Sequence, residues 1–188
     1  PIIRDPYTIT QSDILIIEST YGNRLHSEIG QVADRLAQVI NQTVSRGGKI
    51  IVPSFALERT QELVYTLHRL RLDNRIPEIP VYVDSPLATD ATEIFRLHPE
   101  CFDEEVNELL RTVDDPFGFH LLHYTRNTEE SKQLNNIDTP MIIISASGMA
   151  ENGRILHHLK NNIENPLNTV LIVGWQAVNT LGRKIEEK

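Results

Sequence analysis

The sequence predicts an α/β fold, an open and mostly parallel sheet with helices on both faces. Short runs of β-branched residues alternate with amphipathic stretches along the whole chain, which is the pattern of strands joined by helices. The first run, Asp13–Glu18, is apolar at consecutive positions, as in a strand that is buried on both faces. The chain has 188 residues, 40% hydrophobic and 23% charged, which fits one globular domain with a substantial core.

Six apolar runs of strand length punctuate the chain. We predict strands at Asp13–Glu18, Lys49–Val52, Pro80–Val83, Phe119–His123, Met141–Ser145 and Thr169–Val173.

Helices are predicted between these strands from apolar stripes, caps and stops. The first spans Ser27–Arg46 and ends at Gly47-Gly48, and the second runs from an N-cap at Ser54 through Leu70. The others are a helix that begins at Ser85-Pro86 and breaks at His98-Pro99, then Asp103–Leu110, Thr128–Leu134, Arg154–Asn162 and a last helix capped by Thr180.

Composition excludes several classes of protein. No apolar run approaches the roughly 20 residues that a bilayer span needs, so we expect no membrane partner. A single cysteine, Cys101, excludes an internal disulfide framework and a Cys-based zinc site, and it fits the reducing cytoplasm. The N-terminus is not a signal peptide and lacks Met, which predicts an excerpt of a longer chain.

The loops that follow five predicted strands share one chemistry. Each contains Ser, Thr or Gly, and four of the five bring an Arg within the next few residues. Glycines and small hydroxyl residues let backbone N–H groups approach an anion, and Arg offers a planar fork to phosphate oxygens. The net charge of −8 argues weakly against nucleic acid, so phosphate binding would have to be local. Taken singly, each loop also fits ordinary caps and turns.

Two carboxylates end apolar strands. Glu18 is costly to bury without a partner, so it either orients a histidine or a metal-bound water, or it caps the following turn at the surface. Asp84 holds the same relative position, and we interpret it as a structural cap. His157 and His158 are interpreted as packing or surface groups, because the histidines show no metal-binding spacing. Walker, Rossmann and nucleophile-elbow motifs are absent from the sequence.

The loops together resemble the β-CASP domain, a cassette of RNA-processing nucleases in the metallo-β-lactamase superfamily. The residues that carry the resemblance are Glu18-Ser19-Thr20-Tyr21-Gly22, Pro53-Ser54-Phe55-Ala56, Asp84-Ser85-Pro86-Leu87-Ala88, Ser145-Ala146-Ser147-Gly148-Met149 and Gly174-Trp175-Gln176-Ala177. The match keeps the family's order and covers nearly all of 1–188. It implies a β-CASP cassette with Rossmann-like layering, related to the mRNA 3′-end-processing endonuclease.

The resemblance also implies roles. Glu18 matches the family's first β-CASP motif, an acidic residue near the zinc centre that pairs with a catalytic histidine. Single-stranded RNA would lie along a path formed by Arg24, Ser54, Arg59, Ser147, Gly148, Arg154, Thr180 and Arg183. The ligands of the two zinc ions would lie outside this segment, which alone should cleave nothing. The metallo-β-lactamase domain of the same parent chain would be a partner, and a homodimer is compatible with this interpretation.

Two other readings stay open. One is a small-molecule or nucleotide-sugar-binding α/β domain, whose binding would depend little on salt. The other is a non-catalytic scaffold homologue that has lost the metal ligands. The choice between exonuclease and endonuclease, and between RNA and DNA, is also open.

Overall fold

The computed structural model describes residues 2–23 and 31–188. Its centre is a five-stranded sheet in the order β3-β2-β4-β1-β5, and each of the four strand pairings in this sheet is parallel. The strands are β1 (Ile50–Pro53), β2 (Val81–Asp84), β3 (Leu122–Tyr124), β4 (Ile142–Ser145) and β5 (Thr169–Val170). The predicted open sheet is therefore confirmed, with parallel strands throughout.

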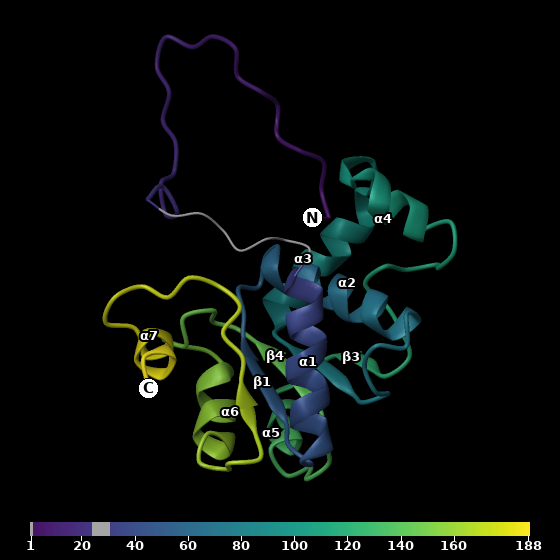
Figure 1. Ribbon diagram of the computed structural model, residues 1–188, viewed down its shortest axis with the longest axis vertical. Coiled ribbons are helices and arrows are strands. Elements are labelled where there is room, and N and C mark those ends of the chain that lie inside the picture. Colours follow the sequence, from purple (N-terminus) through teal and green to yellow (C-terminus); the bar gives the residue numbers. More distant parts are fainter. Residues whose placement is uncertain (1, 24–30) are drawn as a thin grey trace.

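Seven α-helices lie within the described residues and cover both faces of the sheet (Figure 1). They are α1 (Val32–Ser45), α2 (Arg59–Leu72), α3 (Pro86–Leu97), α4 (Glu104–Leu109), α5 (Thr128–Leu134), α6 (Ile155–Asn162) and α7 (Leu181–Glu186).

The period-2 alternation of the strands divides the core into two layers. In β4, Ile142 and Ile144 face a cluster with α1, α2 and α3, whereas Ile143 faces a cluster with α5 and α6. In β1, Ile51 shares the second cluster. The β-branched strands are buried on both faces, which explains why they read as continuous apolar runs.

The predicted element positions are close to the observed ones, with three small corrections and one large one. The predicted N-cap at Ser54 is wrong: α2 begins at Arg59, because the chain first turns through 55–58 and Glu58 takes a positive φ of 66°. The last strand ends at Val170 instead of Val173. The strand predicted at Phe119–His123 is shifted, because Leu121 has a positive φ of 71° that no strand residue adopts. Of the first predicted helix, 27–30 lies outside the described residues.

The largest correction concerns Asp13–Glu18. This segment forms no strand in the described structure and runs away from the sheet (Figure 1). Its apolar side chains are exposed, with Ile16 94% and Ile14 82% accessible. A strand needs a neighbour to accept its backbone hydrogen bonds, and none of the described strands pairs with this segment.

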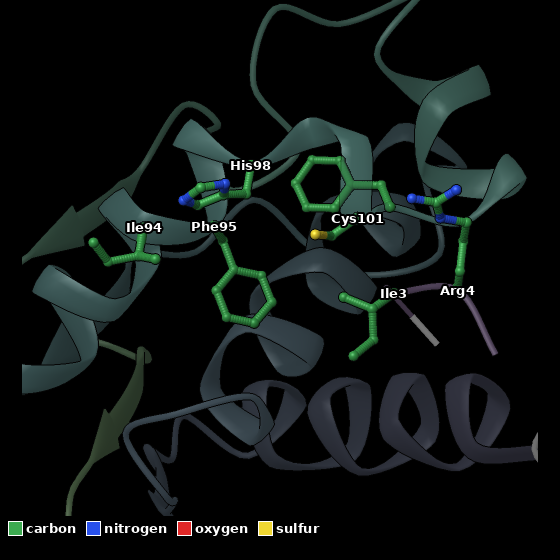
Figure 2. A pocket seen from close by; sticks show the side chains of 7 residues that line it. Ile3, Arg4, Ile94, Phe95, His98 and Cys101 are labelled. Atoms are coloured by element: carbon green, nitrogen blue, oxygen red, sulfur yellow. The ribbon is translucent and has the colours of Figure 1, made fainter. Parts of the chain in front are cut away.

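The chain start lies against the turn that follows α3. Ile3 forms an antiparallel bridge with Phe102, and the N–H of Asp103 donates to the Ile2 carbonyl at 2.9 Å. A cavity of about 460 Å³ lies beside this contact, lined mainly by apolar side chains, with Arg4 and His98 as its basic groups (Figure 2). These residues come from α3 and its neighbours, and the ends of the strands do not contribute to the cavity.

Candidate nucleic-acid interface

The carboxyl ends of parallel strands meet at one edge of a sheet, where α/β domains bind ligands. In this chain, that edge is formed by the residues that follow β1, β2, β3, β4 and β5. Most of the residues predicted from the sequence to contact RNA follow these strands and therefore lie along this edge.

The loop after β4 is tied to the start of α7. The Gln176 side chain donates to the Gly148 carbonyl at 3.0 Å, and the N–H of Gly182 donates to the Met149 carbonyl at 2.9 Å. Thr180 caps α7 by accepting from the Arg183 N–H at 3.3 Å, as predicted for the cap. Hence the structure brings the segments that carry Ser147, Gly148, Thr180 and Arg183 together.

The loop after β1 packs against the same place. The Ser54 N–H donates to the Ser145 carbonyl at 3.0 Å, which extends the pairing of β1 with β4. A Cβ on Gly148 would lie 2.6 Å from the Phe55 ring, so only glycine fits here without moving Phe55. Ser54 itself is 1% exposed, and its hydroxyl accepts from Thr60 at 3.1 Å. The Phe55 ring therefore packs directly on the Gly148 backbone, and the Ser54 hydroxyl points into the protein.

The predicted arginines differ in how strongly they are bound by carboxylates of the protein. Arg59 pairs with Glu62 at 2.6 Å, and Arg183 pairs with Glu187 at 2.7 Å. Both pairs are partly exposed and lie within one helical turn, and such pairs exchange readily for another anion. Arg24 lies outside the described residues.

Arg154 is held differently, because it points inward to a buried carboxylate. Its Nη1 donates to Asp84 Oδ1 at 2.7 Å and to the Thr125 carbonyl at 3.2 Å, and its Nη2 donates to the Arg126 carbonyl at 2.8 Å. Asp84 ends β2 and is fully buried, and its Oδ2 accepts from the Ser131 hydroxyl at 2.5 Å. These contacts join residues after β3, the end of β2 and the start of α6.

His158 completes this buried cluster. Its Nε2 lies 2.7 Å from Asp84 Oδ2, and its Nδ1 lies 3.0 Å from Asn135 Oδ1. Asn135 Oδ1 also accepts from Asn162 Nδ2, which donates in turn to the His158 carbonyl at 2.8 Å. Both ring nitrogens of His158 therefore lie within hydrogen-bonding distance of side-chain oxygen atoms.

The surroundings of Asp84 determine its charge. Burial alone would raise the pKa of Asp84, but the hydrogen bonds from His158, Ser131 and Arg154 outweigh it and hold the pKa below its ordinary value. The interpretation of Asp84 as a cap is thus wrong: Ser85 caps α3, and Asp84 is the centre of a charged network. His158 is buried in the same network, where its Nε2 contacts this carboxylate.

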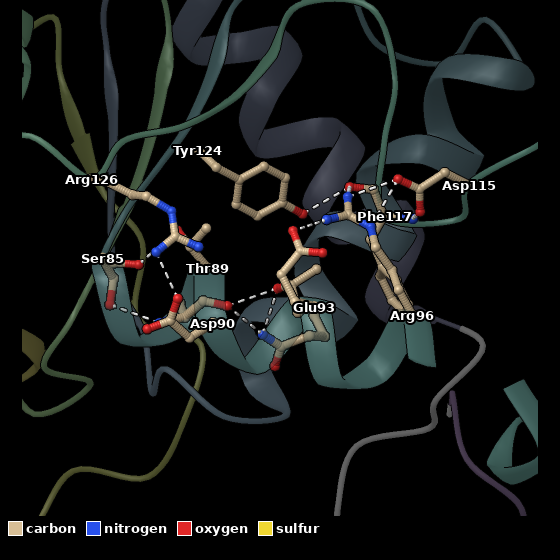
Figure 3. Close-up of polar contacts among 12 residues, drawn as sticks. Ser85, Thr89, Asp90, Glu93, Arg96, Asp115, Phe117, Tyr124 and Arg126 are labelled. Atoms are coloured by element: carbon tan, nitrogen blue, oxygen red, sulfur yellow. Dashed lines mark hydrogen bonds and ion pairs between the residues drawn. The ribbon is translucent and has the colours of Figure 1, made fainter. Parts of the chain in front are cut away.

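A second polar network covers α3 on the side of β3 (Figure 3). Arg126 pairs with Asp90 at 2.7 Å, and Arg96 bridges Glu93 at 2.8 Å and Asp115 at 2.7 Å. Tyr124 donates to the Phe117 carbonyl, and burial raises its pKa to about 12 despite the nearby Arg96. This network adds one arginine, Arg126, to the carboxyl edge.

Glu18 is not brought to this edge. It is exposed, and its Oε2 accepts from the Thr20 N–H at 2.8 Å, so it caps the turn that follows it. This contact is the one expected if Glu18 caps the turn that follows it.

Among residues 2–23 and 31–188, no group of three or more His, Cys, Asp or Glu side chains is placed to hold a metal ion. The described residues therefore do not by themselves fit a zinc centre. Nor does any helix among them have the length and apolarity to cross a membrane.

Sequence reasoning missed the Asp84 cluster although one signal was present. Ile155, His158, Leu159 and Asn162 recur at helical spacing and are all buried, so His158 had to lie on the inner face of α6. A basic side chain there needs a buried acceptor, and the Asp at the end of β2 supplies it.

The fold and its edge define the class of this protein: an open, parallel α/β domain whose strand ends carry backbone N–H groups and arginines. A family model described as the Beta-Casp domain matches residues 60–185. The chain belongs to the Beta-Casp domain family, which confirms the resemblance seen in its loops.

Curated relatives match almost the whole chain. Ribonuclease TTHA0252 of Thermus thermophilus is 35% identical over 98% of this chain and 42% of its own length. An RNase J-like protein of Methanocaldococcus jannaschii is 32% identical over 95% of this chain and 41% of its own length. The transcription termination factor FttA of Methanosarcina mazei is 31% identical over 93% of this chain and 28% of its own length. The chain thus spans less than half the length of these relatives.

Proposed function

We propose that this chain is the RNA-binding β-CASP domain of a longer ribonuclease of the metallo-β-lactamase fold, which hydrolyses phosphodiester bonds in single-stranded RNA. The observation that carries the proposal is the match to a ribonuclease over 98% of this chain but only 42% of the relative. In the proposed parent, residues 1–188 cover the active-site cleft of the metallo-β-lactamase domain. The single cysteine supports a cytoplasmic location.

Zinc is part of this proposal for the parent only. Two zinc ions would activate water and stabilise the displaced oxygen. Since the described residues offer no metal-binding group, the ligands would come from other parts of the parent.

Glu18 is the catalytic candidate in this chain. It follows an apolar segment whose side chains are exposed, as expected of a surface that another part of the parent covers. In that setting, we propose that the Glu18 carboxylate orients the histidine that serves the metal centre or acts as general acid.

The proposed RNA path runs along the loops after β1, β4 and β5. Gly148 lets the loops after β1 and β4 pack together, because only a glycine leaves room for the Phe55 ring, and Arg59 and Arg183 are held only by partly exposed carboxylates. Ser54, Ser147 and Thr180 shape these loops, and Arg24 and Arg154 complete the proposed set. Because the chain carries a net charge of −8, RNA must be attracted by this local edge and not by the overall field.

The test is zinc-dependent cleavage of a 5′-labelled single-stranded RNA. The proteins compared are residues 1–188, the longer parent, the parent with Glu18→Ala and the parent with Asp13→Ala, a matched change on the same exposed segment. We expect cleavage by the parent and by Asp13→Ala, a large loss in Glu18→Ala, and none by residues 1–188. Cleavage by 1–188 alone would refute the cassette, and a parent that never cuts RNA would favour a scaffold.

A further inference from the structure

Arg126 lies at the carboxyl edge beside the loop after β2, which has no arginine of its own. The loop after β2, which begins Asp84-Ser85, contains no arginine. β3 is the neighbour of β2 in the sheet, and Arg126 follows the end of β3 by two residues. The arginine that serves the β2 loop is therefore supplied by the adjacent strand, and Figure 3 shows Arg126 beside Ser85 and Asp90.

The backbone at Arg126 is fixed from inside the protein. Arg154 donates to the carbonyls of Thr125 and Arg126, at 3.2 and 2.8 Å. Arg154 is itself held by Asp84, and the Thr125 N–H continues the sheet by donating to the Val83 carbonyl at 3.0 Å. The buried cluster thus sets the path of the chain at the point where the Arg126 side chain leaves it.

The two arginines differ in what a phosphate would have to displace. Binding at Arg154 would separate its guanidinium from Asp84, a fully buried carboxylate, which is strongly unfavourable. Binding at Arg126 would replace Asp90 in an ion pair whose side chains are 57% and 61% exposed. Exposed pairs contribute little free energy, so a phosphate competes there easily.

We propose that Arg126 contacts the phosphate backbone of single-stranded RNA, and that Arg154 acts in RNA binding as a positioning residue through the Arg126 backbone. This refines the RNA path and rests on the proposed function. The guanidinium of Arg126 would bind phosphate oxygens with its planar fork, as Arg does in other phosphate sites. Asp90 holds the side chain at the edge until RNA takes its place.

The test is a double-mutant cycle on RNA binding. Fluorescence anisotropy of a labelled single-stranded oligonucleotide is measured over a series of KCl concentrations with Arg126→Gln, Arg154→Gln and the double variant. We expect Arg126→Gln to lower affinity severalfold and to reduce the salt slope by about 0.7, the value for one contact on a single strand. The double variant should bind no more weakly than Arg126→Gln alone. Additive losses, with a second reduction of the slope, would show that Arg154 contacts phosphate itself.

Asp90 gives a variant of opposite sign with a matched control. Asp90→Asn removes the carboxylate that competes with RNA for Arg126, so affinity should rise. Glu93→Gln removes a carboxylate from the same helix that pairs with Arg96, and it should have a smaller effect. Equal gains in the two variants would mean that only total charge matters and would overturn the assignment of Arg126.

Two further measurements separate folding from binding. Arg154→Lys keeps a cation beside Asp84, but one ammonium group cannot bind the carboxylate and two carbonyls as the fork does. It should reproduce the loss of affinity while near-UV circular dichroism stays unchanged, and normal affinity would overturn the positioning role. If Arg59→Gln weakens binding and Arg126→Gln does not, this inference fails alone. If the unmodified chain does not bind RNA, the proposed function fails with it.

Discussion

β2 and the N-terminal segment are alike in sequence and opposite in structure. Both are short apolar runs that end in a carboxylate, Val81–Asp84 in one and Ile14-Leu15-Ile16-Ile17-Glu18 in the other. In β2, Val83 and Asp84 are fully buried, and the carboxylate has three side-chain partners. In the N-terminal segment Ile16 is 94% exposed, and Glu18 accepts from the backbone of its own turn.

The difference shows that an apolar run predicts burial but does not predict which segment it packs against. β2 lies between β3 and β4, and its carboxylate meets Arg154 at the start of α6 and His158 within α6. None of the described strands lies beside the N-terminal segment. A buried carboxylate that is paired with Arg154 and hydrogen-bonded to His158 supports the fold. An exposed carboxylate at the end of an apolar run suits a role at a surface between domains.

Removing the two carboxylates should separate the regions most strongly. We expect Asp84→Ala to lower the free energy of unfolding by about 3–5 kcal/mol, since it leaves Arg154 without its buried counter-ion and the buried His158 Nε2 without its hydrogen-bond partner. Glu18→Ala should leave this free energy unchanged within error. Urea denaturation followed by circular dichroism measures both, and equal losses would contradict the contrast.

Truncating one isoleucine in each kind of run tests the same contrast in the apolar core. Ile143 in β4 is fully buried between strands and helices, so Ile143→Ala should cost about 2–5 kcal/mol. Ile16→Ala should have no measurable effect on unfolding. Loss of stability in Ile16→Ala would indicate that the segment packs against the domain in solution.

A single hydrogen bond narrows the comparison further. Ser131→Ala removes the hydroxyl that donates to Asp84 and should cost about 1.5–3 kcal/mol, as for bonds to charged groups. Thr20→Ala is the matched control, because the bond to Glu18 comes from the Thr20 backbone N–H and survives the substitution. Thermal unfolding of the two variants checks the difference.

The pH dependence of stability should carry the smallest signature. The folded pKa of Asp84 lies below its unfolded value of about 3.9, so its stabilising contribution is present above that pH. It is lost as pH falls through the folded pKa. Asp84→Asn should therefore flatten the acid limb of a stability-against-pH curve, whereas Glu18→Gln should leave that limb as steep as in the unmodified chain.

Most of the fold was accessible from the sequence because its elements are locally marked. The helix Thr128–Leu134 begins and ends where its pattern predicts. Asp103 caps α4, which is typical of a carboxylate directly before a helix. Ser54 is not the N-cap of α2, because a turn at 55–58 separates it from the helix, which begins at Arg59. Residue propensities do not indicate such a turn. The segment 13–18 was misassigned because pairing is a property of two segments, not of one.

The site was less accessible, since its chemistry depends on neighbours in space. Arg126 belongs beside the β2 loop only because β3 pairs with β2, and strand order does not follow from strand positions. Arg154 carries the same local signal as Arg59, yet one faces a buried carboxylate and the other a partly exposed one. These ion pairs can be identified only when the spatial neighbours of each arginine are known.

The strand order has a consequence for how the chain acquires its structure during synthesis. β1 lies between β4 and β5, so Ile50 pairs with Ile142 and Thr169, both of which the ribosome adds much later. Until then its apolar residues have no strand beside them. Contacts between such distant parts of a chain form slowly. The apolar β1 segment therefore stays unpaired in the nascent chain until Ile142 and Thr169 have been added.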